Sequence, residues 1–317
     1  MKQLITGLHH ITALASDPQK NVDFYAGVLG LRLVKKTINF DVPEVYHLYY
    51  GNETGSPGTI LTFFPYPGIT QGRKGKGQLT VTSFSIPKLA IDYWIRRLNK
   101  FHIVCEEPQE RFGDLVIYFE DHDGLALELV ANDRDERAGF TYGNIPAQFA
   151  IKGFYGMTLS EECYEKTAGL LIEQMDHALI DESSNRFRFS ASGKPGDFVD
   201  VLCAPDALKG LGGYGTVHHV AFATASDATQ WEAREKLLNA GLNVTPVLDR
   251  QYFHSIYFRE PGGVLFEIAT LSPGFTIDEP LEHLGTALKL PSWEEQSRKA
   301  IERTLPPIQL DIKTFAD

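Results

Sequence analysis

The sequence predicts an α+β fold in which four βαβββ modules form two open barrel-like domains, followed by a C-terminal helical tail. Two observations predict this fold. Four stretches of the chain repeat one order of elements: a short alternating strand, an amphipathic helix, and then several more strands. In addition, the segments Asp123-Gly124-Leu125-Ala126-Leu127-Glu128-Leu129 and Gly262-Gly263-Val264-Leu265-Phe266-Glu267-Ile268 both place an acidic residue after a turn and inside an apolar strand.

The four modules follow one another along the chain, and each carries its helix near its beginning. Module one opens with the strand Gly7-Leu8-His9-His10-Ile11-Thr12, and its helix is announced by Ser16-Asp17-Pro18 and closed by Gly30. The helix of module four has Gly241 as its C-cap. The modules are expected at about 7–68, 77–131, 151–204 and 215–271, with helices near 17–30, 91–98, 161–173 and 231–238.

The modules are expected to work in pairs. A helix that covers one face of a small curved sheet leaves the other face open, so two modules must join to enclose a cavity. We expect an N-terminal half at 1–140 with modules one and two, and a C-terminal half at 150–317 with modules three and four. A metal site is expected where modules one and four meet. The tail from about Ser272, with a helix start at Pro291-Ser292-Trp293-Glu294-Glu295, is expected to pack on the barrels.

The composition limits the class of protein. With 30 basic and 41 acidic residues the formal charge is −11, which disfavours a nucleic-acid partner. The N-terminal segment is not a signal peptide and no stretch reaches the length of a membrane span, so we expect a cytoplasmic protein without a membrane partner. Cys105, Cys163 and Cys203 form an odd set without CxxC spacing, and we expect buried free thiols.

Strand periodicity selects candidate metal ligands. Because side chains alternate across a strand, only one histidine of each His-His pair should point into the cavity, and the apolar neighbours of His10 and His219 make these two the inward ones. Glu267 lies inward by the same logic, because Phe266 and Ile268 suit the helix-covered face. Two imidazoles and one carboxylate form the facial arrangement of non-haem Fe(II) oxygenases.

Each module offers one inward position on its first strand and one on its last. The first-strand positions are expected to hold His10, Val81, Tyr155 and His219, and the last-strand positions a residue near Thr62 and Phe63, then Glu128, Asp200 and Glu267. Pairing module three with module four would instead give a site of His219, Glu267 and Asp200. Pairing module one with module two would leave His10 and Glu128, too few ligands for a tight site. A buried unpaired carboxylate is costly, so Glu267 needs a cation or a proton.

Other polar residues have both structural and functional interpretations. Arg250 and Tyr257 lie on the strands that lead to Glu267, where they could hold a substrate oxygen, although a surface arginine and a packing tyrosine are nearly as consistent with the pattern. Glu128 lacks nearby histidines and is interpreted as a relic of the repeat. The glycine-rich basic segment 72–77 is interpreted as an exposed linker. The remaining single histidines are expected to be satisfied core residues: His47, His102, His122, His177 and His283.

The chain resembles the vicinal oxygen chelate superfamily, and within it the ring-cleaving hydroquinone dioxygenases of the chlorohydroquinone dioxygenase type. The resemblance spans nearly the full length and rests on several segments together. It implies Fe(II) on His10, His219 and Glu267, with His9, Thr12, His218, Arg250 and Tyr257 near the substrate. The segments are Leu8-His9-His10-Ile11-Thr12, Tyr46-His47-Leu48-Tyr49-Tyr50, Gly72-Arg73-Lys74-Gly75, His218-His219-Val220-Ala221-Phe222 and Pro261-Gly262-Gly263-Val264-Leu265-Phe266-Glu267.

We therefore expect an Fe(II)-dependent dioxygenase that opens the ring of a hydroquinone-type or catechol-type aromatic, with dioxygen as second substrate. His9, Arg250 and Tyr257 are expected to be catalytic, and Thr12 and His218 to bind substrate. Mn(II) would fit the same ligands. The alternatives are a glyoxalase-type lyase or isomerase that uses Zn(II) or Ni(II), and a non-catalytic protein that binds an aromatic toxin. The sequence leaves the oligomeric state open, a homo-oligomer included.

Overall fold

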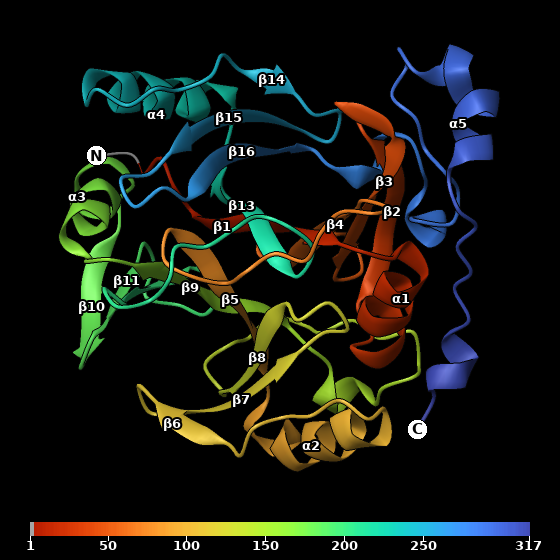
Figure 1. Ribbon diagram of the computed structural model, residues 1–317, viewed down its shortest axis with the longest axis horizontal. Coiled ribbons are helices and arrows are strands. Elements are labelled where there is room, and N and C mark those ends of the chain that lie inside the picture. The colour runs from red at the N-terminus through yellow and green to blue at the C-terminus, as the bar shows by residue number, and fades with distance from the viewer. Residues whose placement is uncertain (1–2) are drawn as a thin grey trace.

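Two eight-stranded sheets form the body of the protein, as seen in a computed structural model that describes residues 3–317 (Figure 1). The first sheet holds the strands of modules one and four, and the second holds those of modules two and three. In spatial order the first sheet is β14 (Leu248–Asp249), β15 (Phe253–Arg259), β16 (Leu265–Pro273), β13 (Thr216–Thr224), β1 (Gly7–Ala15), β4 (Ile60–Pro65), β3 (Val42–Gly51) and β2 (Arg32–Asn39).

The second sheet repeats this order with the other two modules. Its strands are β10 (Ala178–Ser183), β11 (Arg186–Ser190), β12 (Phe198–Cys203), β9 (Gly153–Glu161), β5 (Gln78–Ile86), β8 (Ala126–Ala131), β7 (Asp114–Glu120) and β6 (Gln109–Arg111). The predicted fold of four modules in two open barrel-like domains is confirmed. Each predicted half of the chain, 1–140 and 150–317, contributes strands to both sheets.

The helices lie outside the sheets, and the first of them begins at its expected capping signal. In α1 (Pro18–Val22) the Asp17 side chain accepts a hydrogen bond from the Lys20 amide, and the chain continues as a π-helical segment, Asp23–Val28. The third module differs from the prediction, because β9 continues to Glu161 and its helix begins only at Glu165. The other helices are α2 (Ile91–Lys100), α3 (Glu165–Gln174), α4 (Asp227–Asn239) and α5 (Arg298–Thr304).

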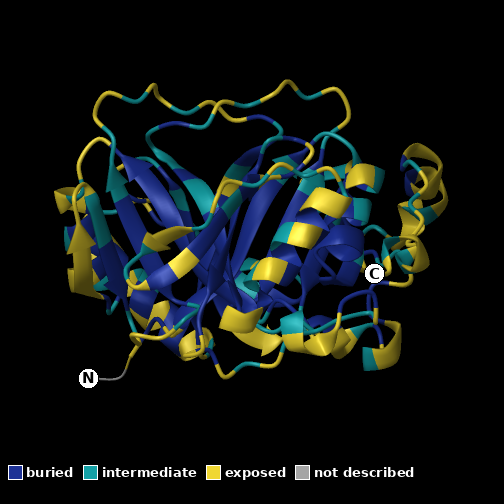
Figure 2. Cartoon of the chain, turned by 90° about the horizontal axis from the view of Figure 1, so that it is seen from below, coloured by how far each residue is buried: buried dark blue, intermediate teal, exposed yellow. Residues whose placement is uncertain are grey.

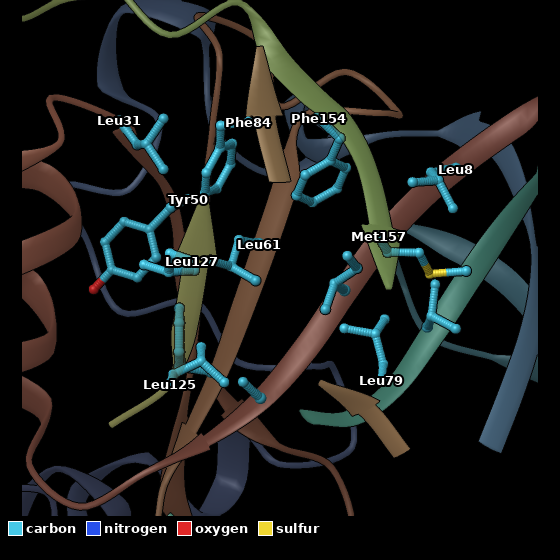
Figure 3. Close-up of a cluster of buried hydrophobic side chains, with 14 of the residues drawn as sticks. Leu8, Leu31, Tyr50, Leu61, Leu79, Phe84, Leu125, Leu127, Phe154 and Met157 are labelled. Carbon is cyan, nitrogen blue, oxygen red and sulfur yellow. The ribbon is translucent and has the colours of Figure 1, made fainter. Parts of the chain in front are cut away.

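One apolar core joins the two sheets. Leu8 and Leu61 of the first sheet belong to the same cluster of buried side chains as Phe84, Phe154 and Met157 of the second, and Figure 3 shows them between the strands. The buried residues concentrate in the strands, whereas the exposed ones lie on helices and on the rim (Figure 2). This continuous core holds the two sheets in a fixed relation to each other.

The C-terminal tail packs along the outside of modules one and two, as predicted. It forms the helix α5, which begins at Arg298, a few residues after the predicted start (Figure 1). Tyr46 donates a hydrogen bond from its hydroxyl to the Pro306 carbonyl, and Arg97 of α2 reaches the Asp317 carboxylate at 2.6 Å. The last residue of the chain is therefore fixed against a helix of module two.

Two further findings concern the chain as a whole. Within residues 3–317 no helix is both long enough and apolar enough to cross a membrane. The three cysteines are free, but the expectation that they are buried is wrong, because Cys163 is exposed and Cys105 and Cys203 are half-buried.

Candidate metal centre

Both His-His pairs contain a β-bulge, and this places their rings. Between β1 and β13 the register skips His9 on one strand and His218 on the other. Strict alternation would send these two histidines to the face opposite His10 and His219, as the sequence predicted. The bulges instead keep each pair of rings together, with centroids 5.0 Å apart in both pairs.

His10, His219 and Glu267 converge on one point from three adjacent strands. His10 Nε2 lies 3.3 Å from His219 Nε2, and Glu267 Oε2 lies 3.4 Å from the first nitrogen and 3.1 Å from the second. All three side chains are buried, Glu267 completely. Among the described residues they are the one group of three potential ligands whose donor atoms lie within 4.8 Å of one another.

The donor atoms at this point suit a cation. Glu267 Oε2 is buried and has no hydrogen-bond partner in the described chain. A buried carboxylate oxygen without a partner is unfavourable, and a divalent metal is the usual compensation for two imidazoles and one acid at such distances. The residues present therefore fit the kind of metal that the sequence predicted.

Hydrogen bonds from the bulged histidines set the tautomer of the candidate ligands. His9 Nε2 donates to the Thr270 carbonyl at 3.1 Å, so His9 Nδ1 is left as an acceptor for His10 Nδ1, 2.9 Å away. His10 then carries its proton on Nδ1 and presents a lone pair at Nε2. The Nδ1 atoms of His218 and His219 also lie within hydrogen-bond distance, 2.7 Å apart. Such outer hydrogen bonds orient metal-binding histidines.

The third candidate ligand is also oriented from behind. Ser255, fully buried on β15, donates its hydroxyl proton to Glu267 Oε1 and leaves Oε2 facing the histidines. Burial by itself would raise the pKa of Glu267, but His10 and His219 outweigh it and hold the pKa well below its ordinary value. Burial lowers the pKa of His219, and it lowers that of His9 to about 3. The site therefore combines an anionic carboxylate with two imidazole side chains.

A cavity of about 360 Å³ opens directly onto this point. His10 and His219 line it, and most of its apolar lining residues are aromatic, with Leu248 and Leu265 beside them. Its size and lining suit a small aromatic molecule. The aromatic lining residues are Phe40, Tyr49, Phe64, Tyr66, Phe253 and Tyr257.

Arg250 and Tyr257 lie in this cavity, as predicted from the sequence. The Arg250 guanidinium donates from Nε to the Tyr257 hydroxyl at 3.2 Å and lies 3.6 Å from Asp41 across the cavity. Tyr257 stands opposite Glu267 in the β15–β16 ladder, and its ring meets the His219 ring edge-on at 5.9 Å. Burial, followed by the charge of Glu267, raises the pKa of Tyr257, so its phenol keeps its proton.

The other predicted site residues divide into two groups. His218 lines the cavity. His9 and Thr12 do not line it: His9 is buried behind His10, and Thr12 is fully buried with its hydroxyl 2.9 Å from that of Thr62.

Two residues of the site were not predicted from the sequence as site residues. His47, interpreted as a core residue, lines the cavity, and Ser255 contacts Glu267. The alternation in Ser255-Ile256-Tyr257 places Ser255 on the same face as Tyr257, and this signal could have revealed it. Of the other four histidines expected in the core, His177 is buried, whereas His102, His122 and His283 are exposed.

In the second sheet, the positions equivalent to the candidate ligands do not form a metal site. Asp200 occupies the register position of Glu267, and Arg188 binds it at 2.7 and 2.9 Å. The alternative site with Asp200 is therefore not assembled. The equivalent of His10 in module three is Gly156, one residue beyond the predicted Tyr155, because Tyr155 is the bulged residue.

Comparison with known proteins agrees with the fold. Residues 7–129 and 156–268 match the family model of the glyoxalase/bleomycin resistance protein/dioxygenase superfamily. MhqO of Bacillus subtilis (strain 168), which its name assigns provisionally to the ring-cleaving dioxygenases, is 46% identical over 98% of this chain and 99% of its own. The chlorohydroquinone/hydroquinone 1,2-dioxygenase of Sphingobium indicum is 35% identical over 96% of this chain and 97% of its own.

Solved structures lead to the same assignment. A Bacillus subtilis crystal structure, provisionally named a dioxygenase, superimposes with a TM-score of 0.94 at 45% identity over 98% of this chain and 99% of its own. Glyoxalase I from Zea mays shares the fold alone, with a TM-score of 0.62 at 12% identity over 84% of this chain and 92% of its own. The predicted resemblance is thus confirmed, and the chain belongs to the glyoxalase/bleomycin resistance protein/dioxygenase superfamily.

Proposed function

We propose that this protein is an Fe(II)-dependent dioxygenase that opens the ring of a hydroquinone-type or catechol-type aromatic compound. The observation that carries the proposal is the convergence of His10, His219 and Glu267, the two histidines of which line a largely aromatic cavity. Relatives that match nearly the whole chain bear the names of ring-cleaving and hydroquinone dioxygenases, which supports the same reaction class.

The ligand set is the basis for proposing iron. Two neutral imidazoles and one carboxylate occupy one side of a metal and leave its other positions open, and Mn(II) would fit the same donors. When bound, Fe(II) would supply open coordination positions and the one-electron chemistry that a reaction with dioxygen requires. The chain supplies the shape, the charges and the hydrogen bonds around it.

Arg250 and Tyr257 are the residues proposed to act on the substrate. The phenol of Tyr257 accepts from Arg250 and retains its own proton, so it can donate to an oxygen atom on the ring. The guanidinium, held by Asp41 on its other side, offers a fixed positive charge to an oxygen that becomes negative as the ring opens. His218 at the cavity wall is proposed to contact the substrate.

His9 is proposed to position His10 instead of touching the substrate. Its two ring nitrogens are occupied by His10 and by the Thr270 carbonyl, and it does not line the cavity. A catalytic proton shuttle would need access to the substrate, whereas a positioning residue needs only the hydrogen bonds that His9 makes.

The proposed reaction balances without a further reductant. The carbon–carbon bond beside a hydroxyl-bearing ring carbon breaks, and both atoms of dioxygen enter the opened product. The four electrons that dioxygen accepts come from the ring. Consumption of one dioxygen per aromatic molecule, with no added electron donor, is therefore the expected stoichiometry.

The two alternative functions make different demands on the site. A glyoxalase-type lyase would place a second carboxylate near the metal, and the register position equivalent to Glu267 in module one holds Thr62. A non-catalytic binding protein would need no metal ligands with open positions. Both alternatives predict no dioxygen consumption.

The test is an oxygen-electrode assay after anaerobic Fe(II) loading, with hydroquinone, catechol, and methylglyoxal plus a thiol as separate substrates. The proposal predicts uptake with an aromatic substrate alone. Conversion of methylglyoxal and thiol without uptake would favour the lyase, and saturable aromatic binding without uptake would favour the binding protein.

Single substitutions connect this activity to the proposed ligands. His219→Ala and Glu267→Ala should each lose bound iron and dioxygen uptake together, because two remaining ligands hold the ion too weakly. Iron is measured by elemental analysis of the purified variants, with His283→Ala, an exposed histidine, as the control. Full uptake by either ligand variant would remove the proposed mechanism.

A further inference from the structure

Three consecutive residues at the tip of one hairpin form a wall of the cavity at the candidate metal centre. The hairpin joins β2 to β3, and Asn39, Phe40 and Asp41 at its tip all line the cavity. Across the cavity, the Asp41 carboxylate lies 3.6 Å from the Arg250 guanidinium. The position of this hairpin tip therefore decides how closely the wall fits a bound molecule.

The hairpin tip is loosely joined to its own sheet. The regular ladder between β2 and β3 ends where Ile38 pairs with Tyr46, and the register then skips to the pair of Asn39 with Val42. Residues 43–45 of β3 are left outside the ladder by this skip. In addition, β2 is an edge strand of the first sheet. Contacts from outside the hairpin are therefore needed to fix its tip.

Two such contacts hold the residues on either side of Phe40. Asn39 donates from Nδ2 to the Tyr66 hydroxyl at 2.8 Å. The pair of Asp41 with Arg250 is long, and the Asp41 side chain is 77% exposed, so this pair contributes little. Neither contact involves the ring of Phe40, which is the apolar part of the wall.

The C-terminal tail supplies a contact to the ring of Phe40. The Lys289 amide donates to the Lys36 carbonyl at 2.9 Å, where the tail pairs in parallel with β2. Four residues further along each segment, Trp293 meets Phe40 edge-on, with ring centroids 5.6 Å apart and an interplanar angle of 77°. This geometry is a favourable one for two aromatic rings. The tail thus reaches the outer side of the cavity wall.

Trp293 is not needed to attach the tail. It is 54% exposed, so its indole gains little from burial. The residues before it, Leu290 and Pro291, are buried and fix the backbone beside it. Its contact with Phe40 is the one aromatic pair that Trp293 makes in the described part of the chain. The placement of the indole is therefore accounted for by Phe40.

We propose that Trp293 is a positioning residue of the cavity, which acts through Phe40 to hold the hairpin tip against a bound aromatic substrate. This inference rests on the proposed function, because it needs an aromatic substrate in that cavity. Trp293 does not itself line the cavity. A wall that is already fixed has less freedom to lose when the substrate binds, so the substrate binds more tightly.

Trp293→Ala tests this inference, because it removes the ring that contacts Phe40 and leaves the buried anchors of the tail in place. Trp293→Phe keeps an aromatic ring at the same position. The matched control is Trp231→Ala on α4, because Trp231 is 56% exposed and does not line the cavity. All three substitutions affect exposed side chains, so the variants should fold as the wild type does.

The measurement is the dissociation constant of hydroquinone or catechol, whichever the wild type converts, for the metal-loaded protein without dioxygen. Calorimetry gives this constant, and KM, kcat, metal content and the melting temperature are measured beside it. The value of an edge-on aromatic pair predicts about three- to tenfold weaker binding by Trp293→Ala and an equal rise in KM. Metal content and kcat should not change, and Trp293→Phe and Trp231→Ala should bind as the wild type does.

A double-mutant cycle with Phe40→Ala shows whether Trp293 acts through Phe40. Once the Phe40 ring is absent, Trp293→Ala should weaken substrate binding no further. An equal additional loss in the two backgrounds would overturn the inference, because Trp293 would then act by another route. Equal losses in Trp293→Ala and Trp231→Ala would overturn it as well.

The remaining outcomes separate this inference from the proposed function. Wild-type turnover of an aromatic substrate together with unchanged binding by Trp293→Ala overturns the inference alone. A wild type that consumes no dioxygen with hydroquinone or catechol overturns the proposed function and the inference together. If Trp293→Ala does not fold, Trp293→Leu, which keeps an apolar side chain without a ring, takes its place with the same expected loss of binding, and unchanged binding by that variant overturns the inference.

Discussion

At the scale of single residues, the first histidine of each pair has a task distinct from that of the second. His10 and His219 present their Nε2 atoms to one point, and His9 and His218 lie against the Nδ1 atoms behind them. A β-bulge at each first histidine makes this possible, because regular alternation would place the two rings on opposite faces. Each pair thus combines one candidate ligand with a histidine that orients it.

Ser255 orients Glu267 as His9 and His218 orient the other two candidate ligands. Removal of the Ser255 hydroxyl should therefore weaken metal binding. Ser255→Ala leaves the carboxylate without the donor that holds Oε1, and loss of such an outer contact typically lowers metal affinity by about 10- to 100-fold. The affinity is measured by competition with a chelator of known strength.

Ser83→Ala is the matched control for this prediction. Ser83 is also a buried serine that donates to a strand carboxylate, Glu128, but it lies in the second sheet. It should leave metal affinity unchanged. Equal affinity losses in the two variants would show that Ser255 has no special relation to the metal centre.

The sequence predicts the candidate ligands better than the residues that hydrogen-bond around them. His10, His219 and Glu267 follow from alternation within single strands and from the cost of burying an unpaired acid. The contact of Ser255 with Glu267 and that of His47 with Thr62 depend on which strands pair and in which register. Periodicity within one strand does not contain that information.

At the scale of secondary-structure elements, one buried arginine of α2 connects this helix to the π-helical segment of module one and to the C-terminal tail. Arg97 of α2 is almost fully buried and donates to the carbonyls of Gly27 and Val28 at the end of the π-helical segment. It also binds the Phe315 carbonyl and the Asp317 carboxylate. A helix of module two thereby holds both the helix of module one and the C-terminal tail.

Arg97→Met should therefore be strongly destabilising. It leaves several buried carbonyls without a donor, and we expect a loss of at least about 3 kcal/mol in the free energy of unfolding. Arg96→Met, on the exposed face of the same helix, is the control and should change stability by less than about 0.5 kcal/mol. Denaturant unfolding followed by circular dichroism measures both, and similar values for the two would contradict this role of Arg97.

The order of elements is well predicted from the sequence, but some boundaries are not. Capping at Asp17 and the amphipathic pattern of α2 are local signals, and both elements form where expected. The start of α3 was placed too early, because β9 continues to Glu161 through its pairing with β12. Sheet pairing overrides the local helix signal in that segment.

At the scale of the whole molecule, the two sheets compensate their buried carboxylates with different side chains. Glu267 in the first sheet faces two imidazoles, whereas Asp200 and Glu128 in the second sheet face guanidinium groups. Arg188 binds Asp200 through two hydrogen bonds and also reaches the Tyr155 hydroxyl at 2.9 Å. The second sheet therefore neutralises its acids with side chains of the protein.

Removal of Arg188 should affect stability and leave the metal centre intact. Arg188→Met removes two of the hydrogen bonds to the buried Asp200 carboxylate and leaves Arg186, at 3.2 Å, as its remaining cation, so the expected loss is about 1–3 kcal/mol. The surface pair of Lys74 with Glu120 is the control, and Lys74→Met should cost less than about 1 kcal/mol. Loss of metal from Arg188→Met at temperatures where it remains folded would contradict the separation of the two sheets.

A buried acid between modules three and four should make stability depend on pH. Burial, together with the nearby Glu260 carboxylate, raises the pKa of Glu161 to about 8. The folded protein therefore holds this proton at pH values where the unfolded chain has released it, so stability falls as pH rises from the unfolded pKa of about 4.3 to about 8. Above that range the loss is complete.

Glu161→Gln removes this dependence, because the amide does not ionise. The variant should be more stable than the wild type near pH 8, by about 1–3 kcal/mol, and the difference should shrink toward pH 5. Thermal unfolding across this range measures it, with Glu162→Gln at the exposed neighbouring position as the control. A stability difference that is independent of pH would contradict the assignment.

An anomalous diffraction map of crystals loaded with Fe(II) or Mn(II) tests the three-ligand site most directly. We expect one strong peak per chain, bonded to His10 Nε2, His219 Nε2 and one oxygen of Glu267. A metal bound at another position, or loaded crystals with no peak between the first and fourth modules, would contradict it.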